Sequence, residues 1–340
     1  MSGGQPLLVG GQAPWFEDFA VGDDFSDVPS VTLTDAHGAI HQALFGDRLR
    51  LPLDHGLARR VTGQPAALVN PSMVCNMAIG LSTIPSQRVL GNLFYRGLTL
   101  RQPVFVGDTL TTTTKVVGLR QNKAREGRPA SGMVALEIHV TNQRHETVML
   151  FWRCPMIPCR DPAANTGHND DFSNMPESIA PAELLALVPD WQYADFRQGL
   201  RGPHFADLSV GSQYQIEARD TVTLAPELVR LTLNMAMTHT DASRSVYGQR
   251  LVYGGHTIAM AAAQLSRLLP TLVSPLGWFK CDHVAPVFEQ DILETHVGIE
   301  GLLPASHRQG AGLALLHVQT YACRAEQTKV LDWHLAALLA

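Results

Sequence analysis

The sequence predicts an α+β protein made of two copies of one domain, each an antiparallel sheet wrapped around a central helix. Three observations lead to this prediction. Similar segments recur in the same order in the two halves of the 340-residue chain, and each half contains a long apolar helical stretch. Each stretch is followed by segments with the alternation and β-branched content of strands. One helix packed on several long strands fits an α+β layer arrangement.

Three pairs of segments carry the internal repeat. WFEDFAVGDDF begins at position 15 and HFADLSVGSQY at position 204. PVFVGDTLTTTTKVVGL begins at 103 and PVFEQDILETHVGIEGL at 286, and RHETVMLFW begins at 144 and RAEQTKVLDW at 324. Because the separation between the members of a pair is nearly the same each time, we interpret the chain as a duplication that forms a pseudo-dimer.

In chain order, we expect a flexible N-terminus at 1–14 and a first domain at 15–158. Its central helix is predicted in NPSMVCNMAIGLSTI and its strands in DTLTTTTKVVGL and GMVALEIHVTN. Residues 159–203 begin with many Pro, Asp, Asn and Gly residues, which predicts a surface linker, with one short helix in PAELLALVP. The second domain, 204–340, repeats the order with a helix in GGHTIAMAAAQLSRLL and strands in DILETHVGIEGL and LALLHVQTYACR.

Composition excludes several classes of function. Lys and Arg number 26 against 31 Asp and Glu, and this net charge of −5 gives no field that would attract nucleic acid. No apolar run approaches the roughly 20 residues of a membrane span, and the start lacks the regions of a signal peptide, so we expect a cytoplasmic protein. Five cysteines are scattered, and Cys154 and Cys159 lack the spacing of a zinc site. We therefore predict reduced thiols and no metal.

Polar and flexible residues gather directly before the second central helix, in LNMAMTHTDASRSVYGQRLVYGGH at 233–256. Histidine titrates near neutral pH, and a helix N-terminus presents free N–H groups. The stretch is either a reaction centre or ordinary turn chemistry that leads into a buried helix.

The chain resembles the double hotdog members of the MaoC-like, (R)-specific enoyl-CoA hydratase superfamily, and within it the mesaconyl-CoA hydratase group and uncharacterised mycobacterial members. The resemblance is carried by ALFGDRLRLPLDHGLAR, LGNLFYRGLTLRQPVFVGDTL and RLVYGGHTIAMA, and it covers nearly the whole chain. It implies a double hotdog fold and an acyl-CoA substrate, with no cofactor beyond the CoA that the substrate carries.

The family's signature is roughly Asp-x-Asn-Pro-x-His-x-Asp, followed by a His-Gly-Met that opens the central helix. By this resemblance His239 in NMAMTHTD occupies the position of the catalytic histidine, Asp241 that of the last acid, and Gly255 that of the glycine that polarises the thioester carbonyl. Asn234 stands where the family has its catalytic aspartate. In the first half Asp47 is kept but Pro52 replaces the histidine, so we expect the site in the second half.

Each candidate in the second half also has a plainer interpretation. His239 can act as the base or can cap a loop. An amide such as Asn234 can orient water or bind the thioester but cannot exchange a proton as a carboxylate does. Tyr253 and His256 can assist, or can pack and cap the helix; Gly255 can donate its N–H to the developing oxyanion, or can form a plain turn.

The first half offers Asn70, Cys75 and Asn76 at the corresponding helix. Cys75 can be a nucleophile, but a cysteine in an apolar helix is more often a core residue. Asp47 can be a remnant of the duplicated site or can reach the second one, and a surface turn is the simpler account. Four arginines, Arg48, Arg50, Arg59 and Arg60, can bind CoA phosphates or form a solvated face.

The leading hypothesis is a hydro-lyase that adds water to, or removes it from, an enoyl-CoA. Two rivals keep the fold: an acyl-CoA-binding protein that has lost catalysis, and a thioesterase. Fold resemblance does not choose among them. A homodimer of the two-domain chain is also possible.

Overall fold

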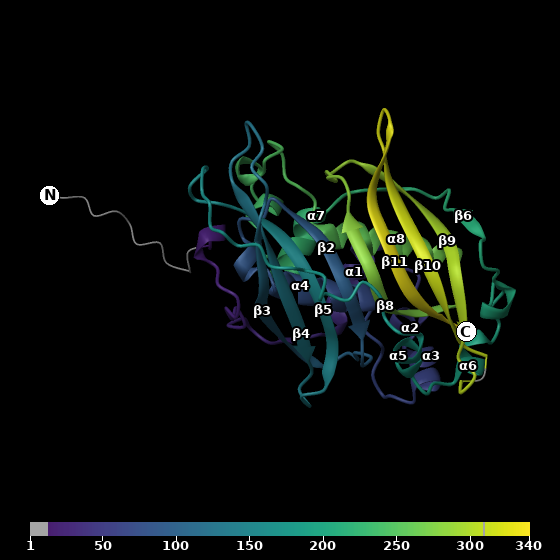
Figure 1. The fold of residues 1–340 in the computed structure, drawn as a ribbon. Helices are drawn as coiled ribbons and strands as arrows, with labels where there is room; N and C mark the ends of the chain where they lie inside the picture. Colours follow the sequence, from purple (N-terminus) through teal and green to yellow (C-terminus); the bar gives the residue numbers. More distant parts are fainter. Residues whose placement is uncertain (1–12, 309) are drawn as a thin grey trace.

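The structure is a computed structural model that describes residues 13–308 and 310–340 (Figure 1). The predicted flexible N-terminus, 1–14, falls almost wholly on residues outside the described part. Within that part, one sheet of 11 strands runs through the molecule. The predicted α+β double hotdog class is confirmed: antiparallel strands of the two halves lie side by side, and the long helices lie against one face of the sheet (Figure 1).

The elements of the two halves follow the duplication. The first half contains β1 (Val31–Thr32), α1 (Asp35–Phe45), α2 (Arg50–Leu53), α3 (His55–Thr62), α4 (Pro71–Leu81), β2 (Gly91–Leu100), β3 (Thr109–Gln121), β4 (Ser131–Thr141) and β5 (Thr147–Pro158). The predicted linker contains α5 (Pro181–Ala186) and α6 (Tyr193–Arg197). The second half contains β6 (Gln213–Gln215), β7 (Asp220–Thr221), α7 (Ala225–Leu231), α8 (Gly254–Leu268), β8 (Leu272–His283), β9 (Ile292–Pro304), β10 (Gly312–Cys323) and β11 (Gln327–Leu339).

Strand order shows the pseudo-symmetry. The order is β1-β3-β4-β5-β2-β8-β11-β10-β9-β6, so β3-β4-β5-β2 is mirrored by β9-β10-β11-β8. The two halves join at β2 and β8, where Tyr95 is paired with Cys281 and Leu98 with Trp278. The join lies in the hydrophobic interior, since Tyr95, Leu98 and Trp278 are all buried. The duplication therefore builds one continuous sheet rather than two separate ones.

The two central helices form the layer that positions the site. Asn70 caps α4 by accepting a hydrogen bond from the backbone N–H of Ser72 at 2.8 Å, and Pro71 follows at the first helical position. Every residue of α4 is buried, as the all-round apolar pattern predicts. The second helix, α8, packs against α4 and begins with Gly254 and Gly255. The N-terminus of each helix is thus held inside the molecule.

Gly255 allows this close packing. A Cβ added at Gly255 would overlap Oδ1 of Asn76 on α4 and would lie 2.7 Å from Cζ of Tyr253. We expect Gly255→Ala to destabilise the protein by about 1–3 kcal/mol, because the buried side chains of Asn76 and Tyr253 must shift to make room for the Cβ. Thermal or urea unfolding measures the change.

Gly38 in α1 is the matched control. A Cβ at Gly38 meets nothing within 4 Å, and the residue is exposed. Gly38→Ala should leave the stability unchanged or raise it by roughly 0.5–1 kcal/mol. Equal stability of the two variants would contradict the packing role of Gly255.

The linker crosses the outer face of the sheet. Its residue Pro176 packs on Gly97 of β2, and Ile179 and Leu184 pack on Gly277 of β8. Glycine at both strand positions gives the linker room, because a side chain there would overlap it. Further along, Leu184, Tyr193 and Phe196 join a second apolar cluster with Leu51 and Leu57 of the first half. The linker is therefore packed structure, as its short predicted helix suggests, and not a loose connector.

Candidate active site

A cavity of about 230 Å³ opens at the N-terminus of α8, where the two halves meet. Both halves contribute to its walls, which are largely apolar. Its polar lining consists of Thr83, Ser86, Asn92, Tyr95 and Arg153 from the first half and Asn234, His239, Tyr247, Tyr253, Thr257 and His283 from the second. The cavity thus brings together three residues singled out in the sequence, His239, Asn234 and Tyr253.

His239 is held in one tautomer. It ends the 3₁₀ turn Met237–His239, and its Nδ1 lies 2.7 Å from the carbonyl oxygen of Leu251. A carbonyl only accepts, so Nδ1 carries the hydrogen and Nε2 keeps a lone pair. Burial lowers the pKa of His239 to about 4, against the opposing effect of the Leu251 hydrogen bond. The imidazole is therefore neutral at neutral pH, and its Nε2 can accept a proton.

A second histidine, His283, shares the cavity, and the sequence analysis did not identify it. It is the last residue of β8, and its ring lies directly over Gly254, where an added Cβ would overlap Nε2. This Nε2 is buried with no hydrogen-bond partner among the described residues. Burial lowers the pKa of His283 to about 4, and the nearby His239 adds to the effect while Asp282 opposes it. Two neutral imidazoles therefore face one small space.

Asn234 and Tyr253 complete the polar wall. Oδ1 of Asn234 accepts from the backbone N–H of Ala236 at 2.9 Å, while its Nδ2 is buried without a partner in the described part of the chain. The Tyr253 hydroxyl donates to the carbonyl oxygen of Asn76 at 3.2 Å. Burial raises the pKa of Tyr253 well above its usual value, so the phenol keeps its proton. Both groups can orient a ligand, and the two histidines are left as the groups able to exchange protons.

The other predicted residues of the second half lie outside the cavity. His256 points away from it, with its ring 4.9 Å from that of Phe45, and burial lowers its pKa to about 4. Gly254, rather than Gly255, lines the cavity, so Gly254 is the better-placed helix N–H donor. Asp241 is exposed and accepts from the backbone N–H of Ser243 at 2.9 Å. It acts as a local cap.

The candidate residues of the first half are buried and do not line the cavity. The surface-turn account of Asp47 is wrong: its side chain is 1% exposed and accepts from Nδ2 of Asn70 at 2.8 Å, because the turn folds under the capped end of α4. Cys75 is buried and does not line the cavity, and burial raises its pKa to about 12, so it is a core thiol. Asn76 is buried beside Gly255 and supplies the carbonyl for Tyr253.

The four arginines of the first half lie away from the cavity. Arg50 donates to the carbonyl oxygen of Phe196 in the linker at 2.6 Å, which ties α2 to α6. The other three, Arg48, Arg59 and Arg60, are exposed. This is the pattern of a solvated face with one structural contact.

A second, smaller pocket of about 40 Å³ is the duplicated counterpart of the cavity. The repeat relates its walls to those of the open one: Pro103 corresponds to Pro286, and Leu100 to His283. Apolar residues replace the histidines, since Pro52 and Leu100 stand at the positions of His239 and His283. Three linker residues, Leu187, Pro189 and Trp191, line its mouth. The duplication therefore leaves one larger cavity that contains histidines and one smaller pocket without them.

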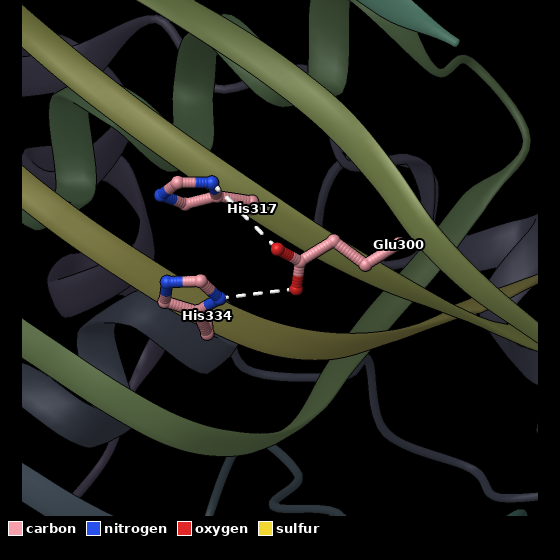
Figure 2. A group of neighbouring side chains, drawn as sticks. All are labelled: Glu300, His317 and His334. Carbon is pink, nitrogen blue, oxygen red and sulfur yellow. Dashed lines mark hydrogen bonds and ion pairs between the residues drawn. The ribbon is translucent and has the colours of Figure 1, made fainter. Parts of the chain in front are cut away.

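A cluster of Glu300, His317 and His334 lies on β9, β10 and β11 (Figure 2), and none of the three lines the cavity. Glu300 contacts Nδ1 of His334 at 3.0 Å and Nδ1 of His317 at 3.7 Å, and Asp332 contacts the Nε2 atoms at 3.2 and 2.9 Å. The rings are stacked 4.0 Å apart and nearly parallel. Ligand lone pairs lie in the ring plane, so two parallel rings do not converge on one ion. The arrangement is that of a polar network of two carboxylates and two imidazoles.

Comparison with known proteins gives concordant matches. The family model described as mesaconyl-CoA hydratase matches residues 10–267. A mesaconyl-CoA hydratase of Cereibacter sphaeroides is 32% identical over 73% of this chain and 71% of its own. A β-methylmalyl-CoA dehydratase of Chloroflexus aurantiacus is 29% identical over 82% of this chain and 80% of its own. A conserved Mycobacterium tuberculosis protein, described as having a double hotdog fold, superimposes with a TM-score of 0.88 at 41% identity, over 96% of this chain and 99% of that one.

Among the helices of the described residues, none is both long and apolar enough to cross a membrane.

Proposed function

Since the chain belongs to the mesaconyl-CoA hydratase family, we propose that it adds water to, or removes it from, an α,β-unsaturated acyl-CoA thioester in the His239 cavity. The observation that carries the proposal is the fixed tautomer of His239, which leaves a neutral Nε2 on the cavity wall at the N-terminus of α8. Hydration needs a base for water, a proton for the α-carbon and donors for the enolate oxygen.

The chemistry assigned to each group follows from its protonation state. Nε2 of His239 takes a proton from water as the water oxygen bonds to the β-carbon. The electrons of the double bond move toward the thioester oxygen, where the N–H of Gly254 and the positive end of α8 stabilise the charge. A proton returns to the α-carbon from the imidazolium, so one water is consumed and the base is regenerated. The reaction uses no cofactor beyond the CoA of the substrate.

His283, the last residue of β8, is the second histidine that we assign to the reaction. Its unpaired Nε2 lies over Gly254, where the thioester oxygen would sit. A neutral imidazole with Nε2–H donates to that oxygen, and a tautomer with a free Nε2 binds the attacking water. Either way, His283 contacts the reacting atoms.

The relatives' names guide the choice of acyl group. Mesaconyl-CoA and β-methylmalyl-CoA differ by one water, and both carry a free carboxylate on a methyl-branched acyl chain. We propose a branched, carboxylated acyl group of this size for this chain.

The direct test is an assay of purified protein with crotonyl-CoA, mesaconyl-CoA and longer enoyl-CoAs. Hydration removes the conjugated double bond, so the absorbance of the enoyl thioester should fall with time. Absence of turnover across the whole panel, in both directions, would overturn the proposal.

Asn234 favours one alternative, an acyl-CoA-binding protein that has lost catalysis, since an amide replaces the family's carboxylate. Tight thioester binding without turnover would support that alternative. A thioesterase, the other rival, would instead release free thiol, which a thiol reagent detects in the same samples.

Asn234→Asp tests whether the missing carboxylate limits the rate. We expect hydration to rise about tenfold or more, because a positioned acid–base group contributes roughly 10²–10⁴-fold. The side chain keeps its size, and one carboxylate oxygen can still accept from the N–H of Ala236. Steady-state kinetics measures the rise.

Asn92→Asp is the matched control, because Asn92 lines another part of the same cavity. It adds the same charge at a different point of the cavity wall, outside the 233–256 stretch, and should not raise the rate. A folded Asn234→Asp protein with lower activity than the wild type would show that the amide itself serves the reaction.

A homodimer of the chain and a cytoplasmic location stay predictions. Analytical ultracentrifugation measures the oligomeric state, and cell fractionation measures the location.

A further inference from the structure

Arg153 is a buried cation with hydrogen-bonding capacity to spare. It lies on β5, lines the cavity and is 3% exposed. Nη2 donates to the carbonyl oxygen of Ser82 at 2.6 Å and to Oγ of Ser86 at 2.8 Å. Nε is buried without a partner, and Nη1 has no hydrogen bond to any residue that the structure describes. Two of the three guanidinium nitrogens are therefore left for another group.

No protein anion neutralises this charge within the described part of the chain. Of the described residues that line the cavity, none is an aspartate or a glutamate, and Arg153 forms no ion pair with any described carboxylate. Arg96, the other arginine among the buried polar residues, is different: it pairs with Asp282 and Glu177. An uncompensated buried charge costs several kcal/mol, so a site that keeps one is built to receive an anion.

The position of Arg153 points to the acyl end of the ligand. Arg153 and His239 line the same cavity, so a ligand group bound by Arg153 lies in the space that also contains His239. The phosphates of CoA lie at the far end of a long pantetheine arm, whereas the atoms near His239 are those that react. An anion bound here belongs to the acyl group or forms during the reaction.

We propose that Arg153 is the specificity-determining residue of the cavity and binds a carboxylate at the far end of the acyl group. This assignment rests on the proposed function and names the residue that selects a carboxylated substrate. Nη1 presents its N–H groups to a carboxylate oxygen, while the Ser82 and Ser86 contacts of Nη2 hold the guanidinium in place.

A pair of substrates tests the assignment. Fumaryl-CoA and crotonyl-CoA differ only in a carboxylate in place of a methyl group. The wild type should prefer fumaryl-CoA, and Arg153→Met should lower its kcat/KM about 100-fold, mainly through KM, while crotonyl-CoA changes by less than about threefold. An equal loss for both substrates would overturn the proposal and place Arg153 at the enolate oxygen. No loss for either, or a wild-type preference for crotonyl-CoA, would also overturn it.

Two further variants keep the test decisive. Arg153→Lys retains the charge but loses the planar array of donors that contacts Ser82, Ser86 and the carboxylate together, so it should show an intermediate preference, and it carries the test if Arg153→Met fails to fold. Arg96→Lys makes the same change at the buried arginine outside the cavity and should leave the preference unchanged. Circular dichroism and thermal unfolding check the fold of each variant.

The affinity for unreactive thioesters tests the role of Arg153 independently of the proposed hydration activity. Succinyl-CoA and butyryl-CoA are saturated and do not react, so calorimetry measures their affinity whether or not the protein is a hydratase. Tighter binding of succinyl-CoA in the wild type, lost in Arg153→Met, supports the role of Arg153 even if no enoyl-CoA is hydrated. Equal affinities for the two thioesters would overturn it even if hydration is observed.

Discussion

Replacing His239 by alanine is expected to lower kcat for hydration by roughly 10²–10⁴-fold, because the base that removes the water proton is lost. KM should change little, since the imidazole contacts the reacting water more than the acyl chain. The loss is expected with every enoyl-CoA that the wild type accepts. Steady-state kinetics on the best substrate measures both parameters.

The matched control is His55→Ala at the exposed start of α3, which should behave as the wild type. A folded His239→Ala enzyme with wild-type kcat would contradict the assignment. Tight thioester binding by both the wild type and His239→Ala, with no turnover by either, would favour the acyl-CoA-binding alternative.

The pH profile provides a second check on His239. Burial lowers its pKa to about 4, so Nε2 keeps its lone pair throughout the neutral range. We therefore expect kcat/KM to stay level as pH falls from 8 to about 5 and to decrease below that, as a proton occupies Nε2. A drop centred near 6.5, the ordinary value for histidine, would show that the imidazole is not desolvated in this way.

His283→Leu is expected to reduce kcat by about tenfold or more while leaving the fold intact. In the counterpart pocket of the first half, Leu100 occupies the position that corresponds to His283, so the surrounding backbone accepts leucine. What the variant loses is a polar group over Gly254, at the place where the thioester oxygen would lie. Kinetics and thermal unfolding measure the two effects separately.

Affinity for the unreactive butyryl-CoA controls for a collapsed cavity, and it should stay within a few-fold of the wild type. A His283→Leu protein with unchanged kcat would show that His283 only packs against the helix. Loss of affinity together with loss of stability would show that the ring is needed to keep the cavity open.

Only some of the residues that line the cavity could be predicted from a local sequence motif. His239, Asn234 and Tyr253 belong to one continuous stretch before α8, so a local motif was enough to suggest them. His256 is in the same stretch but lies within the first turn of α8, and the turn of the helix directs it away from the cavity and toward Phe45. Proximity in sequence therefore did not guarantee proximity in space.

His283 and Arg153 were missed because each comes from a strand far along the chain. Neither belongs to a local motif, and a single histidine or arginine in a strand gives no signal by itself. For His283 a usable signal existed: aligning the repeats places it opposite Leu100, a polar residue where the other copy is apolar. Arg153 gives its signal only through burial without a counter-ion, which is a property of the folded state.

The sequence by itself determined the duplication, the two buried helices and the alternating strands, because hydrophobic periodicity and repeated segments are read directly along the chain. The choice of the second half for the site came from the resemblance of its motif to the family signature, and it stays a prediction. Only the tertiary structure decided which polar groups face one cavity. Joining β2 to β8 brings His283 and Arg153 to the N-terminus of α8, and the linker lines the mouth of the counterpart pocket with Trp191. Burial then sets the protonation states, since the loss of water keeps the histidines neutral and leaves Arg153 in need of an anion.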